Sequence, residues 1–186
     1  MERQARRVLV DGPAWAGVDV VGPLADALRL RGRDPAVVDL ADFLRPGSLR
    51  FEHGRDDPQA FAEDWADLDG LRREVLEPLG PNGSGRWLPS LWDPRTDRAT
   101  RAARRPAGPA TVAVVRGWLL LGHDLPAELS VHLALSAAAR RRRVPPAAAA
   151  HELAAFDAYD TEVRPRELAD VVVRCDDPRH LAVSWR

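Results

Sequence analysis

Short apolar runs that alternate with amphipathic segments constrain the fold of this chain more than any other feature of its sequence. Residues 110–115 form a nearly continuous apolar run, which is typical of a strand buried on both faces of a sheet. Residues 7–11 form a shorter run of the same kind, which Gly12 and Pro13 end. The same reasoning predicts further strands at residues 36–40, 129–135, 170–174 and, at a sheet edge, 181–185.

Apolar residues at three- and four-residue steps predict helices between these strands. The helices are expected at residues 20–31, 60–79, 136–143 and 147–163. Strands that alternate with helices build βαβ units, so we expect the α/β class, with a mostly parallel central sheet between two helical layers. The chain has 186 residues, the length of a single domain covering 1–186. Residues 44–58 are expected to form a loop, and residues 81–109 an irregular segment with a hairpin at 86–93.

Parallel α/β sheets bind their ligands at the carboxyl ends of the strands. The loops of interest therefore follow Asp11, Leu40 and Val115. The first of them runs from Gly12 to Gly17 and leads into a helix, which is the G-x-x-x-x-G frame of a phosphate-binding loop. Val18 stands where that loop has lysine, and Asp19 stands where it has serine or threonine.

Several segments together resemble the uridine kinase-like group of P-loop kinases, over nearly the whole chain. Besides the first loop, the matching segments are Ala41-Asp42-Phe43 and residues 55–61, 67–74, 92–98, 162–165 and 169–171. The resemblance implies a three-layer P-loop kinase-like fold, a substrate-side insertion at 81–109 and a lid-like helical region at 136–163. The nearest resemblance is to short actinobacterial members, which fits a chain whose 27 Lys and Arg residues are all arginine.

The departures from the family pattern fall at positions to which the resemblance gives catalytic roles. They are Val18, Asp19, Ala41 and Arg116. In such kinases the loop lysine neutralises phosphate oxygens, and the adjacent hydroxyl holds magnesium. Ala41 replaces the carboxylate that accepts the substrate proton, and Arg116 replaces a carboxylate near the metal. Individual groups of this kind contribute roughly 10²-fold to 10⁵-fold to the rate, so phosphoryl transfer is not expected.

Asp19 and Arg116 carry opposite charges, and we expect them to form a direct ion pair. Trp15, Val18 and Trp118 would then make the former phosphate end of the cleft apolar and aromatic. Such a cavity suits an uncharged ring or chain better than a triphosphate. The alternative, that the two tryptophans only plug a disused site, stays open.

The other end of the cleft keeps more of the family pattern. The resemblance gives Asp56 a contact with sugar hydroxyls, Trp92 and Asp93 a surface in the nucleoside pocket, and Arg98 a place close to it. These four residues join Trp15, Asp19, Arg116 and Trp118 as candidate ligand-binding residues. Asp56 has an alternative role as the cap of a helix that begins near residue 58.

Candidate catalytic groups are few: Asp42, Asp56 and His123. Asp42 follows Ala41 by one residue, and adjacent residues at a strand end point to opposite sides. His123 lies near the carboxyl end of a predicted strand, where a solvated loop histidine is the simpler reading. The five histidines and the single cysteine, Cys175, show no metal-ligand spacing, so we expect no metal and no cofactor.

Composition excludes other classes of function. The net charge of −1 argues against a nucleic-acid partner that is bound through bulk positive charge. A chain without lysine cannot use a Schiff-base lysine or a phosphate-loop lysine. No apolar stretch approaches the length of a membrane span, so we expect no membrane partner and a cytoplasmic location. A small-molecule ligand is expected, and a homo-oligomer or a pathway partner stays open.

Three functions remain as hypotheses. The first is a pseudokinase-like protein with a degenerate Walker A loop, which binds a small organic molecule or performs non-phosphoryl chemistry on it, in specialised metabolism. The second is an active ATP-dependent nucleoside kinase of the uridine type with rearranged residues, which requires binding of MgATP. The third is a regulatory or structural subunit, for which Trp65, Trp87 and Trp185 would form one exposed apolar patch.

Overall fold

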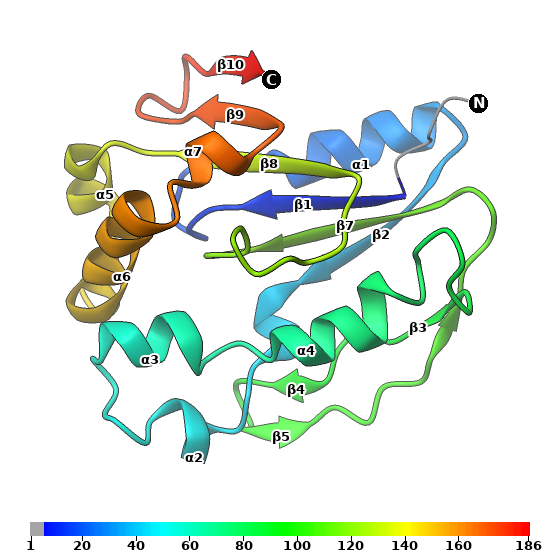
Figure 1. Ribbon diagram of the computed structural model, residues 1–186, viewed down its shortest axis with the longest axis horizontal. Coiled ribbons are helices and arrows are strands. Elements are labelled where there is room, and N and C mark those ends of the chain that lie inside the picture. The colour runs from blue at the N-terminus through cyan, green and yellow to red at the C-terminus, as the bar shows by residue number, and fades with distance from the viewer. Residues whose placement is uncertain (1–5) are drawn as a thin grey trace.

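The centre of the molecule is a six-stranded sheet with the strand order β10-β9-β8-β1-β7-β2 (Figure 1). The computed structural model describes residues 6–186. All neighbouring strands are parallel except the antiparallel edge pair of β9 and β10. The strands are β1 Arg7–Asp11, β2 Asp34–Asp39, β7 Thr111–Gly117, β8 Leu129–Ala134, β9 Val171–Arg174 and β10 Ala182–Trp185. The predicted α/β class with a mostly parallel sheet is confirmed.

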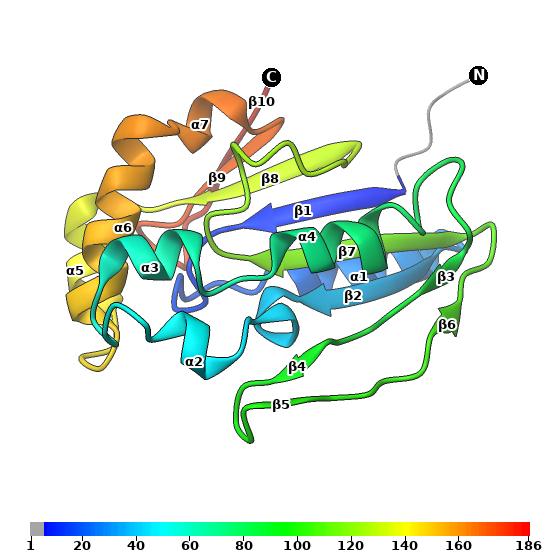
Figure 2. The ribbon, with the colours of Figure 1, turned by 60° about the horizontal axis from the view of Figure 1, so that its bottom comes forward.

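Helices lie on both faces of the sheet, which gives the three predicted layers (Figure 2). Alternate residues of β1 face different layers: Val8 packs in one core cluster with Val21 of α1, and Leu9 packs in another with Leu71 of α4. The helices are α1 Val21–Leu30, α2 Gly47–Arg50, α3 Pro58–Glu63, α4 Leu68–Leu71, α5 Ala137–Arg143, α6 Ala149–Glu162 and α7 Pro165–Leu168, with the short helices η1 Leu40–Phe43 and η2 Arg72–Leu76. Within residues 6–186, every helix is too short or too polar to cross a lipid bilayer.

The sheet register brings the carboxyl-terminal parts of four strands together. Asp11, the last residue of β1, lies opposite Gly117 of β7 and His132 of β8. Asp39, the last residue of β2, lies opposite Arg116 of β7. The loops that follow these strands therefore meet at one edge, as the sequence pattern predicts.

The predicted single helix over residues 60–79 is wrong, because the chain breaks between α3 and α4. The Arg45 amide donates to the carbonyl of Trp65 (2.9 Å), and the Asp67 amide donates to the carbonyl of Phe43 (2.7 Å). The Asp67 carboxylate then accepts from the Gly70 amide (2.8 Å) and caps α4. The break is thus stabilised by backbone bonds to a distant segment and by a new helix cap.

Residues 86–106 form a long, interrupted hairpin that lies beside the main sheet (Figure 2). Its antiparallel pairs are β3 Arg86–Trp87 with β6 Arg105–Pro106, and β4 Trp92–Asp93 with β5 Arg98–Ala99. The predicted hairpin at 86–93 is therefore wrong in its pairing, since both of its arms pair with the later return segment. The predicted loop at 44–58 also contains the short helix α2.

Candidate functional site

A cavity of about 250 Å³ opens at the carboxyl edge of the sheet, between the first loop and the ends of β2 and β7. The positions that depart from the kinase pattern all line it: Val18, Asp19, Ala41 and Arg116. Trp118 adds an aromatic wall, and the remaining lining is mostly apolar. The chain fold thus brings together five of the residues that the sequence analysis singled out.

The first loop ends before α1 begins. Gly12 adopts φ +152°, and a Cβ atom at this position would lie 2.7 Å from the Cβ atom of Leu133. The position therefore requires glycine. Helix α1 starts only at Val21, so Val18 and Asp19 precede the helix.

The Asp19 carboxylate occupies the amino-terminal end of α1. Its Oδ1 atom accepts a hydrogen bond from the Gly22 amide (2.9 Å). A Cβ atom at Gly22 would lie 2.4 Å from Asp19 Oδ2, so the carboxylate packs directly over the glycine backbone. Helix amino termini bind anions through free amides and the helix dipole. Here the chain supplies that anion itself.

The predicted ion pair between Asp19 and Arg116 is wrong. Arg116 instead binds Asp39, with Nε 2.7 Å and Nη2 2.6 Å from Asp39 Oδ2. The parallel register places these two residues opposite each other on neighbouring strands, whereas Asp19 lies on a separate loop. Asp39 also accepts from the Ala41 amide (2.9 Å) through Oδ1.

The first and last residues of the arginine run at 140–143 make hydrogen bonds to distant parts of the chain. Arg143 donates to the carbonyls of Ala16 (2.6 Å), Cys175 (2.7 Å) and Asp176 (2.7 Å), so it ties the first loop to the segment after β9. Arg140 is buried and donates to Asp157 and Asp160 of α6. These contacts stabilise the loop and the helical region around the cavity.

Two tryptophans, Trp118 and Trp15, contact the helices α3 and α6. Trp118 stacks on Phe61 of α3, with ring centroids 5.6 Å apart and an interplanar angle of 14°. Trp15 lies outside the cavity lining, and its Nε1 donates to Glu152 of α6 (2.5 Å). Burial raises the pKa of the Glu152 carboxyl, and the hydrogen bond from Trp15 offsets part of the rise.

The predicted ligand-binding residues of the other end do not join this cavity. Asp56 is 75% exposed, with its Oδ1 3.8 Å from His151 Nδ1. Asp57, not Asp56, caps α3 by accepting from the Ala60 amide (2.7 Å). The suggested capping role of Asp56 is therefore wrong, since the next residue, Asp57, caps the helix.

The hairpin residues form a separate hollow on the surface. Trp92 Nε1 donates to Asp97 Oδ1 (2.9 Å), which holds the indole against its own hairpin. Asp93 and Arg98 line an open hollow there. The backbone amide of Arg95 and the hydroxyl of Thr96 donate to Asp93 and lower the pKa of its carboxyl.

The remaining candidate catalytic groups also lie outside the cavity lining. Burial raises the pKa of the Asp42 carboxyl, the Asp39 carboxylate raises it further, and Arg116 offsets part of the rise. Asp42 thus lies within the electrostatic reach of the cavity mouth. His123 is exposed and lines a different hollow of about 480 Å³ between α3 and α6.

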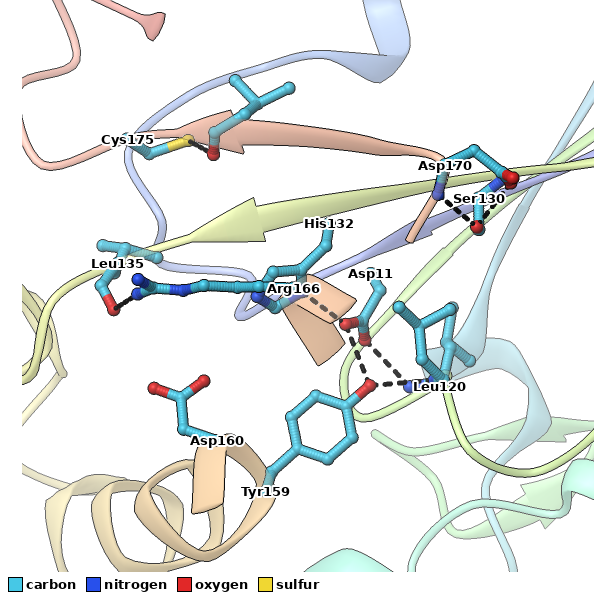
Figure 3. A network of polar contacts seen from close by, with 12 residues as sticks. Asp11, Leu120, Ser130, His132, Leu135, Tyr159, Asp160, Arg166, Asp170 and Cys175 are labelled. Atoms are coloured by element: carbon cyan, nitrogen blue, oxygen red, sulfur yellow. Dashed lines mark hydrogen bonds and ion pairs between the residues drawn. The ribbon is translucent and has the colours of Figure 1, made fainter. Parts of the chain in front are cut away.

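The structure also contains a buried polar network that the sequence reasoning missed (Figure 3). Asp11 is fully buried and accepts from the Leu120 amide (2.8 Å) and the Tyr159 hydroxyl (3.0 Å), with His132 Nδ1 at 2.7 Å. The Tyr159 hydroxyl in turn accepts from the Leu121 amide (2.9 Å). Burial and the Asp11 carboxylate raise the pKa of Tyr159. An aspartate at the end of an apolar strand was the available signal in the sequence.

Comparisons with known proteins identify the fold. No protein-family model matches the chain, and no curated protein matches it in sequence. A possible uridine kinase from Bacillus stearothermophilus is similar in structure, with a TM-score of 0.70 and 18% identity over 92% of this chain and 90% of that one. A candidate fructose transport system kinase from Silicibacter sp. TM1040 has a TM-score of 0.64 and 24% identity, over 87% of this chain and 88% of that one. Phosphoribulokinase from Rhodobacter spheroides has a TM-score of 0.58 and 15% identity, over 90% of this chain and 68% of that one. The chain therefore has a uridine kinase-like P-loop kinase fold.

Proposed function

We propose that this chain, which has the uridine kinase-like P-loop kinase fold, does not transfer phosphoryl groups and uses its cleft to bind a small organic molecule. The observation that carries the proposal is the Asp19 carboxylate at the amino-terminal end of α1. That position receives phosphate oxygens in phosphate-binding loops. A second anion there would meet electrostatic repulsion and would compete for the Gly22 amide.

The residues around the cavity do not fit MgATP. Val18 brings no cation to a phosphate, and Asp19 brings no hydroxyl to a magnesium ion. The carboxylate of Asp39 is already engaged by Arg116 and the Ala41 amide. Within residues 6–186, no group of three or more His, Cys, Asp and Glu side chains is arranged to hold a metal ion.

The shape and lining of the cavity support a small, mostly apolar ligand. Its volume of about 250 Å³ lies below the roughly 300–1,000 Å³ that is usual for drug-sized ligands. Val18, Ala41 and Trp118 supply apolar walls, and charged groups stand on only part of the lining. A ligand-binding role in the cytoplasm is part of the same proposal, since the single cysteine of the chain, Cys175, cannot form an intrachain disulfide.

Titration calorimetry with MgATP tests the loss of kinase function. The wild-type chain is expected to give no saturable binding heat. A variant that combines V18K, D19T, A41D and R116E restores the family's groups and is expected to regain nucleotide binding. Micromolar affinity of the wild type for MgATP, or release of ADP in the presence of a nucleoside, would overturn the proposal and favour the active kinase.

Affinity selection from a metabolite extract, read by mass spectrometry, tests the binding role. The wild type is expected to retain a small compound without a phosphate chain. Ala41→Trp fills the cavity and should abolish retention, whereas Trp185→Ala changes an exposed side chain of β10 and should leave it intact. Equal retention by all three proteins would show that the compound binds elsewhere.

A further inference from the structure

We propose that the ligand of this cavity is a small organic monocation, an amine on an apolar body, with its ammonium group on Asp19. This inference rests on the proposed function and names the ligand class of the same site. The first observation behind it is that Asp19 and Arg116 do not form an ion pair. Both residues line the cavity, yet Arg116 is held by Asp39, and no ion partner for Asp19 exists among residues 6–186.

The free oxygen of Asp19 is the first element of the site. Its Oδ1 atom accepts from the Gly22 amide, and no side chain or amide of the described part of the chain donates to Oδ2. A carboxylate oxygen keeps lone pairs for further charge-assisted donors, and a primary ammonium carries three N–H groups. Asp19 is exposed as well as part of the cavity lining, so its side chain offers a hydrogen-bonding position that an amine can reach from solvent.

The charge balance of the lining is the second element. Asp19 and Asp39 bring two negative charges, and Arg116 brings one positive charge, so the three side chains together leave one negative charge. Asp42 adds a carboxyl close to Asp39 and Arg116. The dipole of α1 offsets about half a charge at Asp19. One ligand ammonium reduces the negative charge that Asp19, Asp39 and Asp42 leave after Arg116 and the dipole are counted, whereas a ligand carboxylate adds to it.

The walls and the size complete the ligand class. Val18, Ala41 and Trp118 can cover an apolar body, and an indole face also attracts an ammonium group. The volume of about 250 Å³ lies below the roughly 300–1,000 Å³ of pockets for drug-sized ligands. The site thus suits a compound with a single small ring or a short branched chain.

Three probes of matched shape are 2-phenylethylamine, 2-phenylethanol and phenylacetate. Because they differ mainly in charge, they separate the contribution of the ligand's charge to affinity from that of its apolar body. Binding is measured by NMR titration of the indole N–H signal of Trp118, which is assigned with Trp118→Phe. The amine is expected to bind up to about fivefold more tightly than the alcohol, because the Asp19 carboxylate is exposed, and phenylacetate more weakly than both. Added salt should reduce the advantage of the amine.

Asp19→Asn is the decisive variant. Asparagine caps helices as well as aspartate does, so the bond to the Gly22 amide and the fold should persist. The affinity for the amine should fall to that for the alcohol, while the affinity for the alcohol stays unchanged. Asp26→Asn removes an exposed carboxylate of the same helix, paired with Arg29 on its outer side, and should change neither.

The outcomes separate this inference from the proposed function. If the amine and the alcohol bind equally at Trp118, or if phenylacetate binds best, the monocation is wrong while a binding cleft remains. If none of the probes shifts the Trp118 signal, the inference also fails. Micromolar binding of MgATP to the wild type would instead remove the proposed function itself.

Discussion

Single side chains decide the character of the first loop. Asp19 places a carboxylate at the amino-terminal end of α1, the position at which phosphate-binding loops receive phosphate. Val18 and Ala41 bring neither a cation nor a proton acceptor to the cavity lining. Arg116 is bound within the chain, by the carboxylate of Asp39.

Asp19→Ala should destabilise the fold by about 1 kcal/mol, because the Gly22 amide loses its acceptor at the start of α1. Urea unfolding followed by circular dichroism measures the change. Asp19→Asn is the matched control and should stay close to wild type. A loss of equal size in both variants would show that the charge of Asp19, and not its hydrogen bond, stabilises the helix.

Tyr159→Phe should cost about 1–3 kcal/mol, because it leaves the buried Leu121 amide without its acceptor and removes a donor from Asp11. Thr161→Ala on the same helix removes an exposed hydroxyl that bonds only to the Asp157 carbonyl, and should cost less than half as much. Equilibrium unfolding at neutral pH compares the two. A near-neutral Tyr159→Phe variant would contradict a stabilising role for the network.

Glu152 predicts a pH dependence of stability. Burial raises the pKa of its carboxyl in the folded state above the ordinary value of 4.5. Folding therefore favours the protonated form, and the contribution of this group is full below that ordinary value and is lost as pH rises through the folded pKa. Glu152→Gln keeps an acceptor for Trp15 without the charge.

The Glu152→Gln variant should therefore be more stable than wild type at pH 7, and its advantage should shrink as the pH falls toward 4.5. Denaturant unfolding of both proteins at a series of pH values measures the difference. Greater stability of the wild type at pH 7 would mean that the Glu152 carboxylate is favourably paired in the folded state.

At the scale of elements, apolar runs and periodicity in the sequence predicted the strands and most of the helices. Elements that depend on hydrogen bonds between residues far apart in the sequence could not be predicted in this way. The runs at β1 and β7 are identifiable because buried parallel strands are apolar throughout. The break between α3 and α4 depends on backbone bonds to residues 43–45, which no periodicity reveals. Likewise, the meeting of Val18, Ala41 and Arg116 follows from parallel strand ends, but the choice of Asp39 as the partner of Arg116 depends on register.

Arg143 fastens the first loop to the segment after β9, so Arg143→Gln should loosen that loop. Hydrogen exchange of the amides in residues 12–20 should become faster, because the carbonyls of Ala16 and Cys175 lose a shared charged donor. Arg142→Gln is the neighbouring control, since that side chain is exposed, and it should leave exchange unchanged. Equal protection in both variants would mean that the loop keeps its conformation without the arginine.

At the scale of the whole molecule, helix α6 is joined to the sheet and to the first loop through polar contacts. Tyr159 of α6 reaches Asp11 at the end of β1, and Glu152 reaches Trp15 in the first loop. The tryptophan patch that a regulatory subunit would expose is not formed by Trp65, Trp87 and Trp185. Trp87 belongs to the core, and Trp65 packs against Phe61, which leaves Trp185 exposed on β10.

The carboxylate over the start of α1 means that a phosphate site at this loop needs more than one substitution. A single return of lysine at position 18 would place its ammonium group beside Asp19, where the two charges would bind each other. The lysine would gain a partner within the loop before any phosphate arrived. Under the proposed function, a lysine at position 18 alone is therefore expected to give no nucleotide binding, and residue 19 has to change with it.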